Sequence, residues 1–377
     1  MDVVLIIGVA FAFFLALLLM VRKEKHLSDK ILAAFFILIG TTMLLAWFDF
    51  YNRQNNYPIP ALLGLSTPLI LLHGPCLWFY IKSLTTKNMR FKPLWFLHFL
   101  PFVLVSILMT VGYFSLPASE KIALDSQGLI SRDAMFYLVV AMIAVSTQGY
   151  YIWGLVQIRR YRQKLKTWFS DIQRLNLAWL RSLLIYAIVF YAAISLLYIA
   201  DALFQFLPYS LLQSLGFAIA AIFNIAIGFR GIRQGNVFAD SPVDPAPVST
   251  SKTAPHSKAE DKDAAFVRRL LSHMEDEKPW LDPQLNLAGL SHQLEVTPDY
   301  LSAMLNKQLK RRFFDFVNHY RIEAFKRACR NPQNENYSIM GMAYDAGFNS
   351  KATFNRVFKN DTGLTPGAYY QNVNSRK

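Results

Sequence analysis

Seven apolar segments, each long enough to form a membrane-spanning helix, constrain this chain more than any other feature. A helix needs about 20 mostly apolar residues to cross the hydrocarbon core of a bilayer. Stretches such as IIGVAFAFFLALLLMV lack the polar face, repeating at helical period, that the outer helices of a soluble bundle need. With 54% hydrophobic and 17% charged residues, the 377-residue chain has the composition neither of a disordered protein nor of an ordinary soluble one. We therefore predict seven transmembrane helices, over Val3–Val21, Ile31–Tyr51, Ile59–Ile81, Leu94–Phe114, Ala134–Ile158, Leu180–Phe204 and Tyr209–Phe229.

The basic residues between these segments predict how the helices are oriented. Loops rich in Lys and Arg follow the first, third, fifth and seventh segments: Arg22, Lys23, Lys25 and Lys30; Lys82, Lys87, Arg90 and Lys92; Arg159, Arg160, Arg162, Lys164, Lys166 and Arg174; Arg230 and Arg233. The intervening loops hold only Arg53, Lys121 and Arg132. Because cytoplasmic loops retain Lys and Arg, this alternation places the N-terminus outside and the C-terminus inside.

Three polar residues lie deep inside the predicted spans and are candidate ligand contacts: His73, Gln148 and Asn224. Polar side chains within a bilayer either serve a function or hydrogen-bond between helices, and both alternatives are open here. The third span differs from the others because it contains three prolines and two glycines, at Pro60, Gly64, Pro68, Gly74 and Pro75. Because proline removes a backbone hydrogen bond and kinks a helix, we expect this span to bend or to line a cavity.

The composition changes completely between residues 236 and 263. The stretch NVFADSPVDPAPVSTSKTAPHSKAEDKD is rich in Pro, Ala, Ser and charged residues and has no apolar period, which is typical of a disordered tether. Helical periodicity returns in residues 264–377. We therefore divide the chain into a seven-helix transmembrane domain over 1–235, a disordered linker over 236–263 and an all-helical domain over 264–377.

The C-terminal part contains a first pair of short helices joined by a tight turn. An apolar face at Leu287, Leu290 and Leu294 precedes Thr297-Pro298, which has the residue types of a helix N-cap and first helical position. This order predicts a helix-turn-helix motif. The second helix is expected to expose small or polar side chains that can reach the edges of DNA bases: Asp299, Ser302, Ala303, Asn306 and Lys307.

A second pair of helices follows the same pattern. Ile339, Met342 and Ala343 begin a short apolar helix, Gly347-Phe348 makes the turn, and a further helix opens near Ser350. That helix is expected to bury Phe354 and Phe358 and to present Lys351, Thr353, Asn355, Arg356 and Lys359 on its outer face. Two such units within about 85 residues are a stronger signal than either alone.

The segment between the two units predicts one long helix over residues 313–330, whose apolar residues repeat at helical spacing. Such a helix is about 27 Å long. This length suits a strut that holds two recognition helices about 34 Å apart, one turn of B-DNA. Residues 298–359 hold 11 Lys/Arg and 5 Asp/Glu, a local net charge of +6, which is typical of a DNA-binding surface.

These motifs resemble the AraC/XylS family of bacterial transcription regulators over roughly residues 264–372. The resemblance rests on Ser338-Ile339, Ala343, Gly347-Phe348, Phe354, Arg356, Phe358-Lys359, Gly363-Leu364-Thr365-Pro366 and Tyr369. Two positions depart from the family pattern. Lys310 replaces a glycine that usually follows the first recognition helix, and Met342 replaces an isoleucine, a swap that conserves volume.

The apolar half is similar to the seven-helix N-terminal half of membrane-bound AraC-type regulators. The similarity lies in HGPCLWFYIKSL at His73–Leu84 and HFLPF at His98–Phe102. The resemblance implies a multi-pass protein of the bacterial inner membrane, with a sensing half and a cytoplasmic DNA-binding domain. It implies double-stranded promoter DNA, the lipid bilayer, RNA polymerase and an unknown signal as partners. A homodimer is left open, since two motifs in one chain can already contact two successive grooves.

Two other classes of function compete with a transcription regulator. A transporter or channel with a regulatory DNA-binding tail would carry paired broken helices in two related halves, and only one proline-rich span is present. A membrane enzyme would need a catalytic motif, and HExxH, GxSxG and P-loop patterns are all absent from the sequence, although His73, His98 and Cys76 could suggest a site. The cysteine and histidine spacings predict no metal site, and we expect no cofactor.

Overall fold

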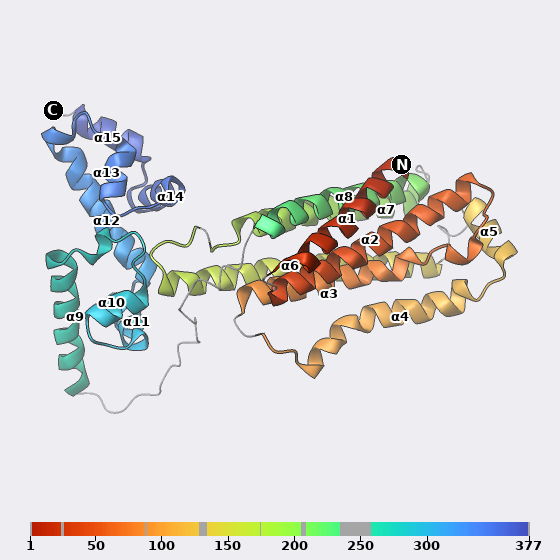
Figure 1. Cartoon of the computed structure of the whole chain (residues 1–377), viewed down its shortest axis with the longest axis horizontal. Helices are drawn as coiled ribbons and strands as arrows, with labels where there is room; N and C mark the ends of the chain where they lie inside the picture. The colour runs from red at the N-terminus through yellow and green to blue at the C-terminus, as the bar shows by residue number, and fades with distance from the viewer. Residues whose placement is uncertain are drawn as a thin grey trace. The chain divides into compact units, whose positions relative to one another are not determined.

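The structure of the protein, a computed structural model, describes residues 2–23, 26–86, 89–127, 134–173, 175–204, 209–233 and 258–375. Over these residues the secondary structure is helical, with one isolated β-bridge between Phe169 and Asn286 (Figure 1). The described residues within 1–159 and 177–240 form one compact unit, and those within 160–176 and 241–377 form a second. The predicted all-α fold class is confirmed.

The first unit contains the long apolar helices. Their bounds are α1 Asp2–Val21, α2 Leu27–Gln54, α3 Ser66–Thr85, α4 Leu100–Met109, α5 Ala118–Ser126, α6 Ala134–Trp168, α7 Ala178–Phe204 and α8 Tyr209–Arg233. A 3₁₀ helix over Pro93–Phe99 precedes α4, and a π-helical turn over Thr110–Phe114 follows it. Helices α1, α2 and α3 pack side by side (Figure 1).

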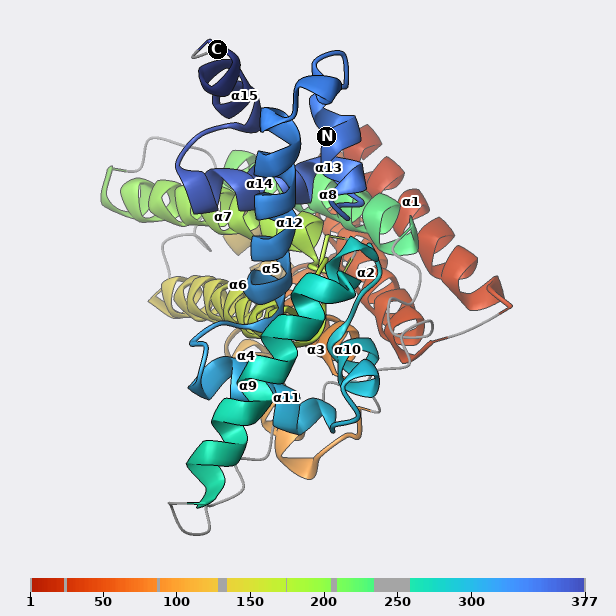
Figure 2. The ribbon, with the colours of Figure 1, turned by 90° about the vertical axis from the view of Figure 1, so that its left-hand side faces the viewer.

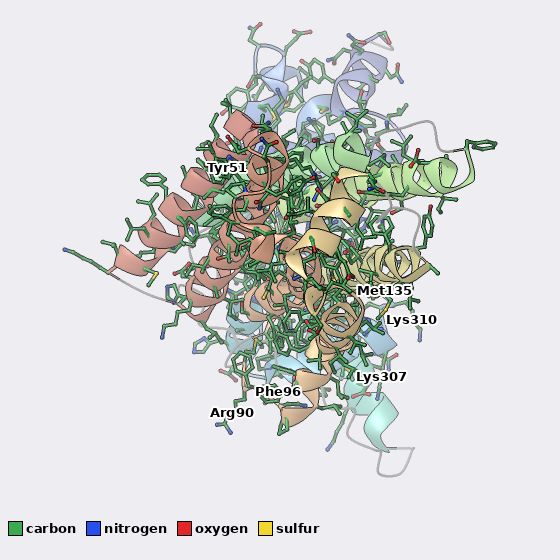
Figure 3. The ribbon with its side chains drawn as sticks, turned by 90° about the vertical axis from the view of Figure 1, so that its right-hand side faces the viewer. Tyr51, Arg90, Phe96, Met135, Lys307 and Lys310 are labelled. Atoms are coloured by element: carbon green, nitrogen blue, oxygen red, sulfur yellow. The ribbon has the colours of Figure 1, made fainter. Side chains whose placement is uncertain are left out.

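Seven helical segments of this unit are long and apolar enough to cross a membrane, which confirms the predicted number. They are Val3–Val21, Leu27–Gln54, Pro60–Thr85, Pro93–Phe114, Ala134–Trp168, Ala178–Asp201 and Leu211–Gly231. Many of their large apolar side chains point away from the helix contacts, among them Phe96, labelled in Figure 3, and Val111, which are 76% and 77% exposed. Such outward apolar faces suit contact with lipid and would be costly in water.

The third span is irregular, as its prolines predict. It begins with a 3₁₀ turn over Pro60–Leu62, Gly64 has a φ of 76° in the left-handed region, and α3 then carries Pro75 in its interior. A β-carbon on Gly64 would lie 3.1 Å from the Tyr113 ring, so glycine allows both the turn and the close packing. Residues of this span line a cavity in the helix bundle, which confirms the second part of the expectation.

The second unit is built on α12, Phe313–Arg330, which is the helix predicted over residues 313–330. The other helices are α9 Lys258–Asp276, α10 Leu287–Gln293, α11 Pro298–Lys307, α13 Ile339–Asp345, α14 Lys351–Thr362 and α15 Pro366–Asn374. Figures 1 and 2 show α12 running lengthwise through this unit, with α10 and α11 toward one end and α13, α14 and α15 toward the other. Two apolar clusters share α12: one contains Leu290, Leu301 and Phe316, the other Phe325 and Phe354.

Two differences from the predicted domain boundaries concern the second unit. Helix α9 begins at Lys258, so the last residues of the predicted linker, 258–263, are helical, and the rest of that linker lies outside the described residues. Residues 160–176, which the sequence places in a loop of the transmembrane domain, belong to the compact C-terminal unit. Helix α6 therefore carries residues of both units.

Candidate nucleic-acid interface

The first helix-turn-helix is formed by α10 and α11, and side chains cap both helices. Asn286 accepts a hydrogen bond from the backbone N–H of Gly289 at 2.9 Å. Thr297 accepts one from the N–H of Tyr300 at 3.3 Å, and Pro298 is the first helical residue. The predicted N-cap and first helical position of α11 are confirmed, and these caps fix the start of the first candidate recognition helix.

Four of the five side chains predicted on the outer face of α11 are accessible. Asp299, Asn306 and Lys307 are exposed and Ala303 is half-buried. Ser302 is only 3% exposed, so its predicted place on the outer face is wrong. Its backbone carbonyl accepts a hydrogen bond from the Asn306 side-chain amide at 2.8 Å, which holds Asn306 against its own helix.

Lys310 occupies the position where the family pattern has glycine, and its backbone explains that pattern. Its φ is 52°, in the left-handed region that favours glycine. A residue with a β-carbon pays about 1–2 kcal/mol for this conformation. The departure from the family pattern therefore leaves the turn in the left-handed conformation and adds an exposed cation beside Lys307 (Figure 3).

The second helix-turn-helix is formed by α13 and α14, and its turn depends on a glycine. Ser338 and Ser350 cap the two helices by accepting hydrogen bonds from the N–H groups of Gly341 and Thr353. Gly347 has a φ of 84°, and a β-carbon there would lie 2.3 Å from the carbonyl oxygen of Trp280. The predicted turn at Gly347-Phe348 therefore packs directly against the backbone that leads into the first motif.

Of the side chains predicted on the outer face of α14, Lys351, Asn355 and Lys359 are exposed. Arg356 is half-buried, and its guanidinium carbon lies 6.0 Å from the centre of the Phe314 ring. This stacking limits the conformations of the long side chain, so less freedom is lost when it binds a partner. Phe354 and Phe358 are fully buried, as predicted.

Thr353 is 2% exposed, so its predicted place on the outer face of α14 is wrong. Its hydroxyl donates to the Asp171 carboxylate at 2.9 Å, and the Gln173 side-chain oxygen lies 3.4 Å away. Both partners belong to the segment 160–176. The sequence gives no local sign of this contact, because about 180 residues separate the two positions.

The same segment also inserts into the core of the C-terminal unit, a placement that the sequence analysis missed. Trp168 is 7% exposed and lies in the apolar cluster that includes Leu270 and Phe316. Lys166 lies 5.0 Å from the centre of the Phe314 ring and pairs with Asp315 at 3.9 Å. The one available signal was Trp168-Phe169, two large aromatic residues within a basic loop.

Arg321 joins this segment to the backbone that leads into the first motif. It is 1% exposed and donates to the backbone carbonyls of Trp280 and Asp282, each at 2.8 Å, and to the Ser170 hydroxyl at 3.3 Å. Burial lowers the pKa of Arg321 to about 10, so the guanidinium stays protonated at neutral pH. Arg321 counts toward the local charge of +6, but its burial makes it a structural cation and not a DNA contact.

One group of possible metal ligands occurs among the residues that the structure describes. Ligand atoms of His319, Glu323 and Asp361 lie within 4.8 Å of one another. The Lys326 ammonium lies 2.8 Å from the Glu323 carboxylate and 3.4 Å from that of Asp361. A protein cation therefore already contacts both of these acidic groups.

The three polar residues predicted within the spans have different surroundings. His73 lines the bundle cavity and lies 3.0 Å from the Thr42 hydroxyl. Gln148 donates to the carbonyl of Ile188 at 3.3 Å, which is the interhelical alternative. Asn224 is fully buried, and its amide has no hydrogen-bond partner within the described ranges. His98 lies 2.8 Å from the Tyr150 hydroxyl, and within the described part of the chain the ligand atoms of His73, Cys76 and His98 do not all lie within 4.8 Å of one another.

Residues 290–372 match a family model described as a helix-turn-helix domain. The matched range begins within α10, includes α11, α12 and the capped pair α13 and α14, and ends in α15. No curated protein and no solved structure matches the chain. The match identifies this region as a helix-turn-helix domain of the AraC type, whose partner is double-stranded DNA, and supports assignment of the chain as a DNA-binding transcription regulator.

Proposed function

We propose that the chain is a membrane-anchored, one-component transcription regulator, in which the seven-helix half perceives a signal and the C-terminal unit binds promoter DNA. The observation that carries the proposal is the pair of capped helix-turn-helix motifs, joined by α12, in the region that the family match covers from within α10 onward. Lys/Arg contacts to phosphates provide most of the affinity, and side chains on α11 and α14 contact the bases. RNA polymerase is the further partner expected at a promoter.

Membrane anchoring is supported by the seven candidate spans and by the alternation of basic and bare loops. An odd number of spans with a basic last loop puts the two ends of the bundle on opposite sides. With the N-terminus outside, the C-terminal unit lies in the cytoplasm, where it meets DNA. In a bacterium this membrane is the inner membrane.

We place signal transmission in residues 160–176. Helix α6 is a candidate span that ends at Trp168, and Trp168 is buried among residues of the DNA-binding unit. Asp171 then contacts Thr353 on the second candidate recognition helix. A signal that shifts α6 or α7 would move this segment and thereby change how α14 is held.

Arg356→Ala tests the DNA-binding assignment. We expect the full-length variant to bind promoter DNA about 10- to 100-fold more weakly, because one side chain contacting a base or phosphate contributes roughly 1–3 kcal/mol. Affinity is measured by fluorescence anisotropy on detergent-solubilised protein at several salt concentrations. The control is Arg327→Ala, which removes an exposed cation from α12 and should change affinity little. Equal losses in the two variants would count against the role of Arg356.

Asp171→Asn tests the proposed role of the loop segment. The amide oxygen can still accept the Thr353 hydroxyl, while a negative charge beside α14 disappears. Removing this charge removes its repulsion of the DNA phosphates, which is worth about 1 kcal/mol in water. Promoter affinity should therefore rise about fivefold. Glu275→Gln on α9 removes an exposed carboxylate remote in the chain from α14 and should leave affinity unchanged. If both variants bind DNA as the wild type does, the negative charge of Asp171 does not affect DNA binding by α14.

A further inference from the structure

The seven-helix unit encloses a cavity of about 210 Å³. Most of its walls are apolar and come from several helices, including Ile39, Met43, Ile70, Val139, Ile143 and Phe217. An apolar cavity of about 150 Å³ in another protein is large enough to bind benzene. The space in this bundle therefore suits a ligand with an apolar body slightly larger than one aromatic ring.

A buried carboxylate lies in the wall of this cavity. Asp49 is 2% exposed, and its two oxygens accept hydrogen bonds from the backbone N–H of Gly64 at 3.0 Å and from the Ser66 hydroxyl at 3.4 Å. Both donors are neutral. Among the residues that the structure describes, none supplies a Lys or Arg nitrogen within ion-pair distance of Asp49.

The nearest guanidinium is engaged by a different carboxylate. Arg53 lies one helical turn beyond Asp49, but it donates two hydrogen bonds of 2.8 Å to Asp125 of α5 and one of 2.9 Å to Gln213 of α8. The Tyr57 hydroxyl also donates to Asp125, at 2.9 Å. The Asp and Arg side chains lining the cavity are thus two carboxyl groups and one guanidinium, so the acidic groups outnumber the Arg side chain.

We propose that this cavity binds a small organic monocation, with Asp49 as its counter-ion. An isolated buried carboxylate is costly unless a cation pairs with it. A primary ammonium group supplies that charge and three hydrogen-bond donors, while its apolar body fills the apolar part of the cavity. The rings of Tyr113, Tyr198 and Phe217 also line the space, and aromatic faces attract cations.

The Arg53–Asp125 pair ties three elements together at one end of this site. It joins the end of α2 to α5 and α8, and Gln213 and Asp125 are cavity-lining residues. In the proposed topology these elements lie at the outer end of the bundle, so the ligand would come from outside the cell. This inference rests on the proposed sensing function, but ligand binding itself can be measured without DNA.

The test uses full-length protein in lipid nanodiscs and three pairs of probes: benzylamine, phenethylamine and hexylamine, each with the alcohol of the same skeleton. Binding is measured by isothermal titration calorimetry at neutral pH. We expect at least one amine to bind about tenfold more tightly than its alcohol, because only the ammonium pairs with the carboxylate. The proposal is overturned if no amine binds more tightly than its matched alcohol.

Variants then assign the preference to Asp49. Asp49→Asn should bind the amine and the alcohol equally, and Asp49→Glu, which keeps the charge, should retain a preference for the amine. Asp29→Asn changes another buried aspartate of α2 that is absent from the cavity lining and should behave as the wild type. Size-exclusion chromatography checks that each variant is folded. An amine preference that persists in folded Asp49→Asn contradicts the proposal, whether or not the protein binds DNA.

Discussion

Gly347→Ala is expected to destabilise the second helix-turn-helix by roughly 3–5 kcal/mol, in the range of the most disruptive single substitutions. The new β-carbon would lie 2.3 Å from the Trp280 carbonyl oxygen and 3.0 Å from the Leu281 α-carbon, and neither backbone atom can rotate away. The left-handed φ of 84° adds about 1–2 kcal/mol. Hydrogen exchange of peptides from α13 and α14 in the full-length protein should accelerate at least about a hundredfold.

Gly363→Ala is the matched control for this prediction. Gly363 has a similar φ of 76°, but a β-carbon there meets no atom within 4 Å. The control therefore carries the backbone cost without the collision, and should accelerate exchange only about tenfold. Similar acceleration in the two variants would show that the packing of Gly347 against the Trp280 backbone is not what restricts this position to glycine. Promoter binding should be lost in Gly347→Ala and largely kept in Gly363→Ala.

Arg321→Met has the second largest expected effect, a destabilisation of about 2–4 kcal/mol. Methionine fills much of the same space but leaves the carbonyls of Trp280 and Asp282 without their donor, and each buried unsatisfied polar group costs about 1–3 kcal/mol. The Ser170 hydroxyl loses a partner as well. Exchange should accelerate in peptides from both helix-turn-helix motifs and in peptides that contain residues 160–176.

Two further substitutions separate the role of Arg321 from a general effect of charge. Arg327→Met removes an exposed cation from the same helix and should change stability by less than about 0.5 kcal/mol. Arg321→Lys keeps the charge but not the planar set of donors, so it should recover only part of the loss. Exchange in residues 160–176 that stays at the wild-type rate in Arg321→Met would contradict the contact between Arg321 and the loop segment.

The helices could be predicted from the sequence because their signals are local. The length of the apolar segments predicted the seven spans, and the helical spacing of apolar residues predicted α12 at Phe313–Arg330. The pair Thr297-Pro298 predicted the start of α11. Gly347-Phe348 was predicted as the turn because it lies between two segments with helical apolar spacing. Each of these inferences depends on residues within a few positions of one another.

What the sequence could not predict depends on contacts between distant residues. Ser302 and Thr353 occupy helix positions next to the exposed face, and only the packing of their neighbours decides that they are buried. Trp168, Ser170 and Asp171 look like part of a membrane loop until the fold brings them to α12 and α14. Arg321 was counted in the local positive charge that indicates a DNA-binding surface. Its hydrogen bonds, however, are made inside the core of the domain.

The central claim is that this membrane-embedded chain recognises specific promoter DNA. The most direct test incubates full-length protein in nanodiscs with fragments of its own genome at about 150 mM salt and sequences the recovered DNA. We predict enrichment of a motif with two half-sites about 10 bp apart, one for each recognition helix, and its loss in Arg356→Ala. Recovery of fragments with no shared sequence, at the same level for wild type and variant, would contradict the claim.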